Sequence, residues 1–412
     1  MLKVLAHSWP LLLGVMLLMV GNGVQGTLLG VRGALENFGT FHLSIVMSAY
    51  FVGFLGGSRL APSMIRRVGH VRVFSALGSL ISAVLILYPL VLDWTAWSLL
   101  RVLIGFCFSG IYVTAESWLN NTATNETRGQ ALSAYMIVQM LGIIASQGLL
   151  AMGNPSGYSL FIIPSVLVSL AFMPLLLADT PAPTFDDAKR MSFTRLFTTS
   201  PLGCVGMLLT GAIYAGMFGM AAVWGAMRAL TFGQIAAFGA TLYIGGLVLQ
   251  YPIGWASDRI DRRLVIMWMA VAGAVVMAVA TSVRLPFLMV LPVALLLGGI
   301  INPLYSLLIA HTNDYLKKED MPGASAGLIF LNGFGAIFGP LVSGWAMGQI
   351  GPSGYFLFIG VLFALLAIYA AWRMRQRVAP AEQSAFAGLS PDATALAVDA
   401  VLDKDLRRKT AA

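Results

Sequence analysis

Two charged side chains, Arg101 and Glu116, lie inside otherwise apolar stretches of the sequence. Positions 101, 105, 109, 112 and 116 recur at about helical spacing, so both side chains share one face of a predicted helix. At a rise of about 1.5 Å per residue they lie about 22 Å apart and do not pair directly. A charge in hydrocarbon is costly and usually faces a bundle interior, and burial favours the protonated carboxyl group. Glu116 is therefore a candidate proton carrier; the alternative is an interfacial carboxylate bonded to Arg128 or Arg72.

His311 is a second candidate for proton exchange. The unperturbed pKa of histidine, about 6.5, suits proton linkage near neutral pH. A lone histidine at a helix end is also a common interfacial residue, and Asp314, one turn further on, would then simply hold the ring.

Uncharged polar side chains also occur at depths where the surrounding sequence is apolar. They serve either to bind a solute or to form interhelical hydrogen bonds, which contribute about 0.6 kcal/mol each on average. Together with Arg101, the candidate substrate-binding residues are Asn22, Gln25, Tyr112, Gln139, Tyr214, Tyr243 and Asn332.

The composition decides the broad class of protein. Of 412 residues, 58% are apolar and only 10% are charged, whereas an ordinary globular domain has about a quarter charged residues. The mean hydropathy is +0.84. A chain this apolar cannot cover itself with polar surface in water, which excludes a soluble enzyme, an extracellular module and a disordered protein. A polytopic membrane protein remains.

The sequence contains few of the motifs that metal binding, cofactor binding or catalysis would need. Cys107 and Cys204 fall inside apolar runs without zinc or redox spacing, and the chain has only 4 histidines. No phosphate-binding loop and no nucleophile–base constellation is present in the sequence. We therefore expect no metal, no cofactor and no enzyme activity.

Twelve apolar runs are long enough to cross a bilayer as helices, which needs about 20 residues each. They are Trp9–Leu29, Leu43–Ile65, Val73–Leu92, Thr95–Leu119, Gln130–Met152, Leu160–Leu177, Leu202–Trp224, Phe232–Trp255, Leu264–Ser282, Phe287–Ala310, Ala324–Met347 and Tyr355–Trp372. The fold class that this predicts is an all-α membrane protein with twelve transmembrane helices.

The distribution of basic residues predicts the orientation. With a cytoplasmic N-terminus, 21 of the 25 lysines and arginines fall on inside segments and 3 on outside segments, as the positive-inside rule requires. Both termini are then cytoplasmic, and the net charge of +8 reflects topology and anionic lipid, not nucleic-acid binding. Tryptophans at predicted span ends indicate interfacial aromatic belts, namely Trp9, Trp94, Trp97, Trp118, Trp224, Trp255 and Trp372.

The polar segment Asp179–Ser200 divides the chain into two halves of six spans each. The loop after the eighth span repeats the loop after the second at an offset of 192 residues, which is typical of secondary transporters built from internal repeats. The predicted organisation is two pseudo-symmetric six-helix bundles, 1–178 and 201–375, a cytoplasmic loop, 179–200, and a cytoplasmic tail, 376–412.

The loop after the eighth span resembles the cytoplasmic signature of the major facilitator superfamily, Gly-x-x-x-Asp-Arg-x-Gly-Arg-Arg. The matching residues are Gly254, Asp258, Arg259, Arg262 and Arg263, with Asp261 at the second glycine. The resemblance implies a conformational latch in which Asp258 bonds a helix N-terminus and an arginine in one state only. In that superfamily the signature follows the second span, where this chain keeps Gly69 and Arg72 but has Arg66 in place of the aspartate.

Two further motifs resemble the same superfamily. Arg101, Gly105 and Gly110 match its arginine motif in the fourth span. A Gly-x-x-x-Gly-Pro motif, which its exporters carry in the fifth span, occurs in the eleventh span as Gly335–Pro340; the fifth span has no proline. This departure favours uptake over export.

The resemblance implies a secondary transporter with a central cavity lined by spans 1, 4, 7 and 10. We would expect a small organic solute, proton coupling, a monomer and a bacterial inner membrane location. The amide and aromatic candidates fit a flat solute, with uptake of a vitamin-like aromatic such as riboflavin as the favoured reading. The alternatives are export of drug-like compounds and, from a different class, a membrane sensor or assembly factor without transport.

Overall fold

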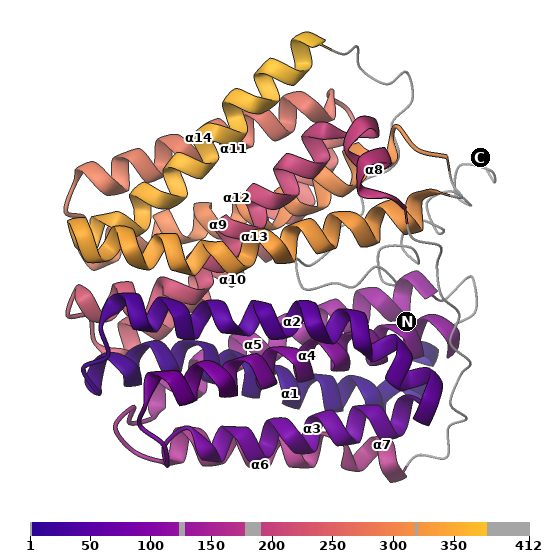
Figure 1. The fold of residues 1–412 in the computed structure, drawn as a ribbon, viewed down its shortest axis with the longest axis vertical. Coiled ribbons are helices and arrows are strands. Elements are labelled where there is room, and N and C mark those ends of the chain that lie inside the picture. Colours follow the sequence, from indigo (N-terminus) through magenta and orange to yellow (C-terminus); the bar gives the residue numbers. More distant parts are fainter. Residues whose placement is uncertain (1, 123–127, 178–190, 318–319, 377–412) are drawn as a thin grey trace. The chain divides into compact units, whose positions relative to one another are not determined.

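The computed structural model describes residues 2–122, 128–177, 191–317 and 320–376, and these are helical apart from short connections (Figure 1). The first group of helices is α1 (Leu2–Leu35), α2 (Thr40–Val68), α3 (His70–Leu87), α4 (Trp94–Thr122), α5 (Arg128–Met152), α6 (Ser159–Ala171) and α7 (Met173–Leu177). The second group is α8 (Phe193–Thr199), α9 (Pro201–Met227), α10 (Phe232–Ser257), α11 (Arg262–Ser282), α12 (Phe287–Asn313), α13 (Met321–Ile350) and α14 (Ser353–Gln376).

Twelve helical segments in the described residues are long and apolar enough to cross a membrane, with α6 and α7 together forming the sixth. The predicted spans are confirmed, although their ends differ. The third span stops at Leu87 rather than Leu92. The segment 179–200, predicted as a loop, contains the helix α8, and residues 376–412 lie almost wholly outside the described residues.

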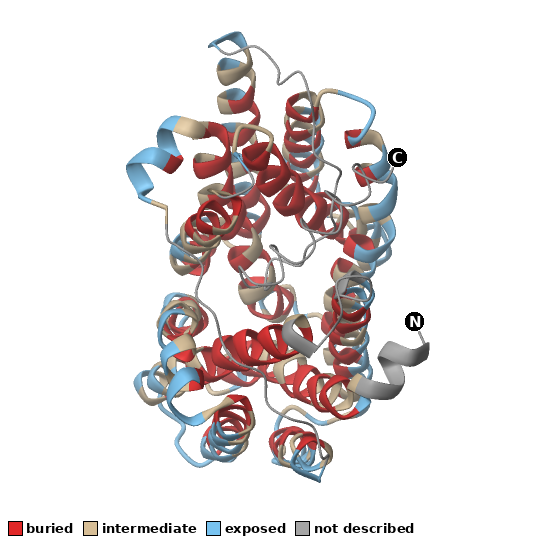
Figure 2. Ribbon diagram, turned by 90° about the vertical axis from the view of Figure 1, so that its right-hand side faces the viewer, coloured by how far each residue is buried: buried red, intermediate tan, exposed pale blue. Residues whose placement is uncertain are grey.

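The chain divides into two compact units. The first contains α1 to α7, and the second contains α8, α9, α11 to α14 and most of α10. Within each unit, buried and exposed residues share the same helices (Figure 2). Many of the exposed side chains are large and apolar, for example Leu99, Leu247 and Ile368. Such an outer surface suits hydrocarbon, since lipid tails are as apolar as leucine.

Glycines set the closest helix crossings, at corresponding positions of the two units. A Cβ atom added at Gly53 of α2 would collide with a carbonyl oxygen of α4, and one added at Gly105 of α4 would collide with a carbonyl oxygen of α2. Gly245 of α10 and Gly298 of α12 make the same reciprocal contact in the second unit. The matched positions differ by 192 and 193 residues, which agrees with the offset of the loop repeat.

The crossing of α1 with α5 and that of α9 with α13 follow the same rule. A Cβ at Gly142 would meet the carbonyl oxygen of Met16, and a Cβ at Gly335 would meet that of Leu208. Gly335 belongs to the Gly-x-x-x-Gly-Pro segment of α13, so at least this glycine permits close packing of two helices. Small residues have this role generally in membrane helices, because they let backbones approach closely.

The expected aromatic belt is only partly present. Trp97, Trp118 and Trp224 are buried within their units, whereas Trp9, Trp255 and Trp372 are about half exposed. Trp97 shows the reason: its indole Nε1 donates hydrogen bonds to two backbone carbonyl oxygens, those of Tyr88 and Val91. A span-end tryptophan therefore need not lie at the lipid interface.

Candidate functional site

Arg101 is the centre of a buried polar cluster in the first unit. Its Nη1 donates to Oε1 of Gln25 at 2.8 Å, and its Nη2 lies 3.5 Å from the sulfur of Met47. The guanidinium carbon lies 4.9 Å from the ring centroid of Tyr50, within the range of a cation–π interaction. Gln25 in turn donates from Nε2 to the hydroxyl of Tyr88 at 3.2 Å.

Helix packing positions this cluster. Arg101 precedes Gly105 by one helical turn, and at Gly105 the helix α4 passes directly against the backbone of Tyr50 on α2. The close crossing therefore presents the ring of Tyr50 to the guanidinium. Side chains from α1, α2 and α4 meet here, together with Tyr88, which directly follows α3.

The arginine is buried, and the contacts described above are to neutral groups. Only 5% of its surface is exposed, and its Nε has no hydrogen-bond partner among the described residues. An unsatisfied buried donor costs about 1–3 kcal/mol. A solute oxygen that accepted from this N–H, or displaced Gln25, would recover part of that cost.

A second polar contact lies further along α1 and α4. Asn22 donates from Nδ2 to the hydroxyl of Tyr112 at 3.1 Å, and that hydroxyl lies 3.4 Å from the sulfur of Met19. Four of the predicted binding residues, Asn22, Gln25, Arg101 and Tyr112, thus lie along the α1–α4 contact. Gln139 is buried on α5, apart from these contacts.

Glu116 is fully buried on α4. The hydroxyl of the next residue, Ser117, lies 3.0 Å from Nε2 of His70, the first residue of α3. The ring of His70 also meets the ring of Trp118 edge-on. The residue after Glu116 in the sequence thus contacts a histidine of α3, a neighbour that the sequence did not indicate.

The candidate binding residues of the second unit make two different kinds of contact. Tyr214 and Tyr243 flank Phe218, with ring centroids at 4.7 and 4.4 Å, so that three aromatic rings form one group between α9 and α10. Asn332 donates from Nδ2 to the backbone oxygen of Met207 at 3.2 Å. This hydrogen bond connects α13 to α9 close to the Gly335 crossing. Asn332 thus forms the kind of interhelical hydrogen bond that was the alternative to solute binding.

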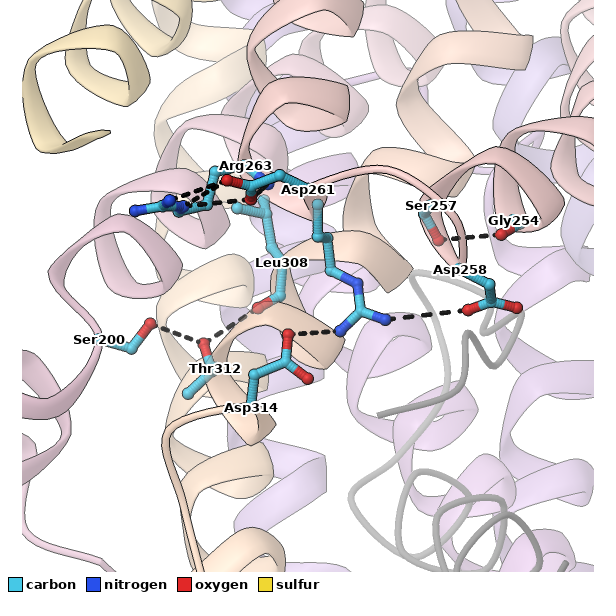
Figure 3. A network of polar contacts seen from close by, with 10 residues as sticks. Ser200, Gly254, Ser257, Asp258, Asp261, Arg263, Leu308, Thr312 and Asp314 are labelled. Atoms are coloured by element: carbon cyan, nitrogen blue, oxygen red, sulfur yellow. Dashed lines mark hydrogen bonds and ion pairs between the residues drawn. The ribbon is translucent and has the colours of Figure 1, made fainter. Parts of the chain in front are cut away.

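The signature loop is organised around Arg262. Its Nη1 donates to Oδ2 of Asp314 at 2.6 Å, and both side chains are about 1% exposed. Asp258 approaches the same guanidinium only to 3.9 Å and is more exposed (Figure 3). Arg259 instead stacks over the indole of Trp255 at 4.1 Å. The tight partner of the signature arginine is thus Asp314 at the end of α12.

Asp261 begins helix α11. Its carboxylate accepts hydrogen bonds from the backbone N–H and the guanidinium of Arg263, the closest at 2.8 Å (Figure 3). Burial by itself raises the pKa of Asp261, but the hydrogen bonds and charge of Arg263 and the charge of His311 outweigh it, so the pKa lies below its usual value. The carboxylate therefore stays ionised near neutral pH.

His311 lines a small cavity beside the start of α9. Its ring meets Tyr315 edge-on at 5.2 Å. Ser200, Arg263 and Arg373 line the same cavity, whose volume of about 20 Å³ has room for a water molecule. Asp314, expected to hold His311, accepts a hydrogen bond from Arg262.

Sequence reasoning missed several members of these clusters, namely Met47, Tyr50, Tyr88, Asp261 and His70, and it did not pair Asp314 with Arg262. Only the helix-capping position of Asp261 carries a local signal, since aspartate is preferred before a first helical turn. In the described residues no group of three or more histidine, cysteine, aspartate or glutamate side chains could hold a metal ion.

Comparison with known families decides the class. The sequence profile described as Major Facilitator Superfamily matches residues 11–240 and again residues 217–409, which together span nearly the whole chain. The chain belongs to the Major Facilitator Superfamily. It is therefore a multi-pass membrane transporter, and its family points to transport of a small solute rather than to catalysis.

Relatives of this superfamily member include proteins without an assigned substrate. It is 24% identical over 354 residues to the uncharacterized MFS-type transporter YcaD of Escherichia fergusonii, covering 85% of this chain and 91% of that protein. It is 26% identical over 372 residues to an uncharacterized MFS-type transporter of Yersinia pestis, covering 88% of this chain and 95% of that one.

Solved structures share the superfamily fold. The nucleoside transporter NupG aligns with a TM-score of 0.71 at 15% identity, over 89% of this chain and 98% of that one. A bacterial homolog of the human lysosomal transporter Spinster, inward-facing and unoccupied, aligns with a TM-score of 0.65 at 13% identity, over 95% and 96%. At these identities the similarity establishes the fold alone.

Proposed function

We propose that this superfamily member takes up a small, flat organic solute by alternating access, driven by protons. The observation that carries the proposal is Arg101, a buried cation whose hydrogen-bond and ring contacts are to Gln25, Met47 and Tyr50. A polar solute edge would exchange with the amide of Gln25, and the adjacent aromatic ring would stack on the flat part of the solute. Asn22, Tyr112 and Gln139 would add further polar contacts.

The second unit would supply aromatic surface. Tyr214, Phe218 and Tyr243 already form a group of rings, and Asn332 lies on the neighbouring α13. A vitamin-like aromatic such as riboflavin fits this combination of rings, amides and one cation. Nucleosides fit as well, since they also join a flat ring system to hydroxyl groups.

Protons would enter the cycle through Glu116 and His311. Glu116 is a fully buried acid on a transmembrane helix, and such residues usually mark ion or proton pathways. His311 would act in the other half, beside Asp261 and Arg263. The loop residues Gly254, Asp258, Arg259, Arg262 and Arg263 would form a latch that holds one state.

The direction of transport rests on the fifth span. Helix α5 contains no proline, whereas the exporter-type Gly-x-x-x-Gly-Pro segment lies in α13. Proton-driven export of drug-like compounds is the competing direction. For the molecule as a whole we propose cytoplasmic termini, a bacterial inner membrane location and a monomer, with bundles 1–178 and 201–375 joined by the cytoplasmic segment 179–200, which contains α8.

Flux into proteoliposomes tests this proposal. Under an inward proton gradient, the wild type should accumulate one compound from a panel of radiolabelled flavins, other vitamins and nucleosides. The Glu116→Gln variant should lose accumulation but keep exchange of internal for external solute. Glu36→Gln makes the same change in a residue that pairs with Arg32 near the end of α1, and it should behave as wild type. Full accumulation by Glu116→Gln would contradict proton coupling through this residue.

A further inference from the structure

An apolar groove lies in the second unit, between the short helix α8 and the helices α9 and α13. Its volume of about 370 Å³ falls within the range of about 300–1,000 Å³ that organic ligands occupy. The groove is lined by Phe193, Phe197, Cys204, Val205, Leu208, Phe330, Leu331 and Phe334. None of these belongs to the proposed transport site.

Helix α8 is held at the mouth of the groove by three contacts. Leu196 is fully buried and packs against Gly327, where a Cβ atom would collide with it. The rings of Phe193 and Phe330 lie 5.4 Å apart. Arg195 forms an ion pair with Asp320 at 2.6 Å, just before α13 begins.

The groove begins at the ends of two membrane spans and extends into them. Helix α9 starts at Pro201, directly after α8, and Leu208 lies about 10 Å further along its axis. The mouth is therefore at the level of lipid headgroups, and the floor is at the level of acyl chains. Phe193, Phe197 and Phe334 are about half exposed, so the groove opens outward.

The lining chemistry selects the occupant. Solute sites combine apolar walls with a few polar groups that fix orientation. This lining offers only hydrocarbon, aromatic rings and the thiol of Cys204, so it suits a plain alkyl chain. At the mouth, Arg195 is 61% exposed and uses one of its five donors on Asp320, which leaves other N–H groups for an anion.

We propose that the groove binds an acyl chain of an anionic phospholipid, with the headgroup phosphate beside Arg195. Basic residues near a membrane surface attract anionic lipids generally. The lipid would fasten α8, the last element before the second set of spans, to the bilayer.

Photocrosslinking in nanodiscs tests the proposal with the full chain. The probe is phosphatidylglycerol carrying a diazirine on its acyl chain, compared with phosphatidylcholine carrying the same chain. Crosslinked residues are located by mass spectrometry of peptides. We expect the phosphatidylglycerol probe to label the α9 and α13 residues of the groove at least about fivefold above other outward-facing helix surfaces.

Two matched substitutions separate the groove from the rest of the surface. Val205→Trp fills the groove and should remove this labelling, whereas Val342→Trp makes the same change on an exposed part of α13 and should leave it intact. Arg195→Gln should abolish the preference for phosphatidylglycerol over phosphatidylcholine. Uniform labelling of all outward-facing helices, unchanged by Val205→Trp, would overturn the proposal.

A thiol measurement keeps the test decisive if Val205→Trp does not fold. In a background without Cys107 and Cys204, which are both buried, Phe334→Cys places a thiol at an exposed position of the groove, and added phosphatidylglycerol should slow its reaction with a maleimide several-fold. An unchanged rate would contradict lipid occupancy. Displacement of the lipid probe by a transported compound would also overturn the proposal, because the groove would then be a solute site.

Discussion

A permanent positive charge inside a membrane protein needs compensation, and two of the four buried arginines in the described residues, Arg262 and Arg101, obtain it differently. Arg262 has a carboxylate partner in Asp314, which gives a short charge-assisted hydrogen bond. Arg101 is bonded to an amide and a thioether and lies over a phenol ring. The ion pair of Arg262 suits a contact that is kept in one conformational state of the transporter and broken in the other. The arrangement at Arg101 leaves a cation that a solute can engage.

The carboxylate that matters most for Arg262 should be Asp314, not the signature residue Asp258. Asp314→Asn would remove the closest carboxylate from a buried guanidinium and should lower the free energy of unfolding by about 3–5 kcal/mol. Asp258→Asn makes the same change at an exposed carboxylate 3.9 Å away and should cost about 0–1 kcal/mol. Unfolding monitored by tryptophan fluorescence checks both variants, and equal losses would contradict the assignment.

Asp261 should contribute stability that depends on pH. Because its pKa is lower in the folded chain than in the unfolded chain, the contribution is complete above the usual aspartate pKa of about 3.9. It is lost as the pH falls through the lower, folded value. Asp261→Asn keeps a good helix cap but removes the charge. The difference in Tm between wild type and this variant should be constant near neutral pH and shrink below about pH 4; a constant difference throughout would refute the assignment.

Helix crossings repeat between the two units, and glycine makes each of them possible. Gly105→Ala should push α4 away from the backbone of Tyr50 and cost about 1–3 kcal/mol. The equivalent Gly298→Ala should cost a similar amount against Leu242. Gly148 belongs to α5, and a Cβ atom added there would meet no other atom within 4 Å. Gly148→Ala should therefore be neutral or slightly stabilising, because alanine favours a helix. Thermal unfolding in detergent compares the three, and a neutral Gly105→Ala would contradict the crossing.

Much of the fold was predictable from the sequence, because each transmembrane span is a long apolar run that needs no tertiary information. The short helix α8 was not, since seven residues in a polar segment carry no helical signal of that length. The candidate site was predicted only in part. The polar residues of α1 and α4 stand out locally, but Tyr50 and Tyr88 reach Arg101 only through helix packing, and Asp314 lies 52 residues from its partner Arg262.

For the whole molecule, the orientation in the membrane is the next property to establish. The charge distribution predicts cytoplasmic termini, so a green fluorescent protein fused after residue 376 should fluoresce. Alkaline phosphatase inserted after Asn37, in the connection between α1 and α2, should be active because that loop is expected outside. The reverse pattern would contradict the predicted topology.

Ligand-induced stabilisation of the purified protein tests the central claim, that Arg101 is part of a binding site for one flat organic solute. Thermal shifts would be recorded with flavins, other vitamins, nucleosides, lipophilic cations, organic anions and sugars. A ligand that binds only the folded state, at a hundredfold excess over its Kd, stabilises it by about 2.7 kcal/mol. The account predicts a clear rise in Tm with one aromatic compound, which Arg101→Gln abolishes and Arg101→Lys weakens. An undiminished shift in Arg101→Gln, or weak shifts with many lipophilic compounds, would contradict it.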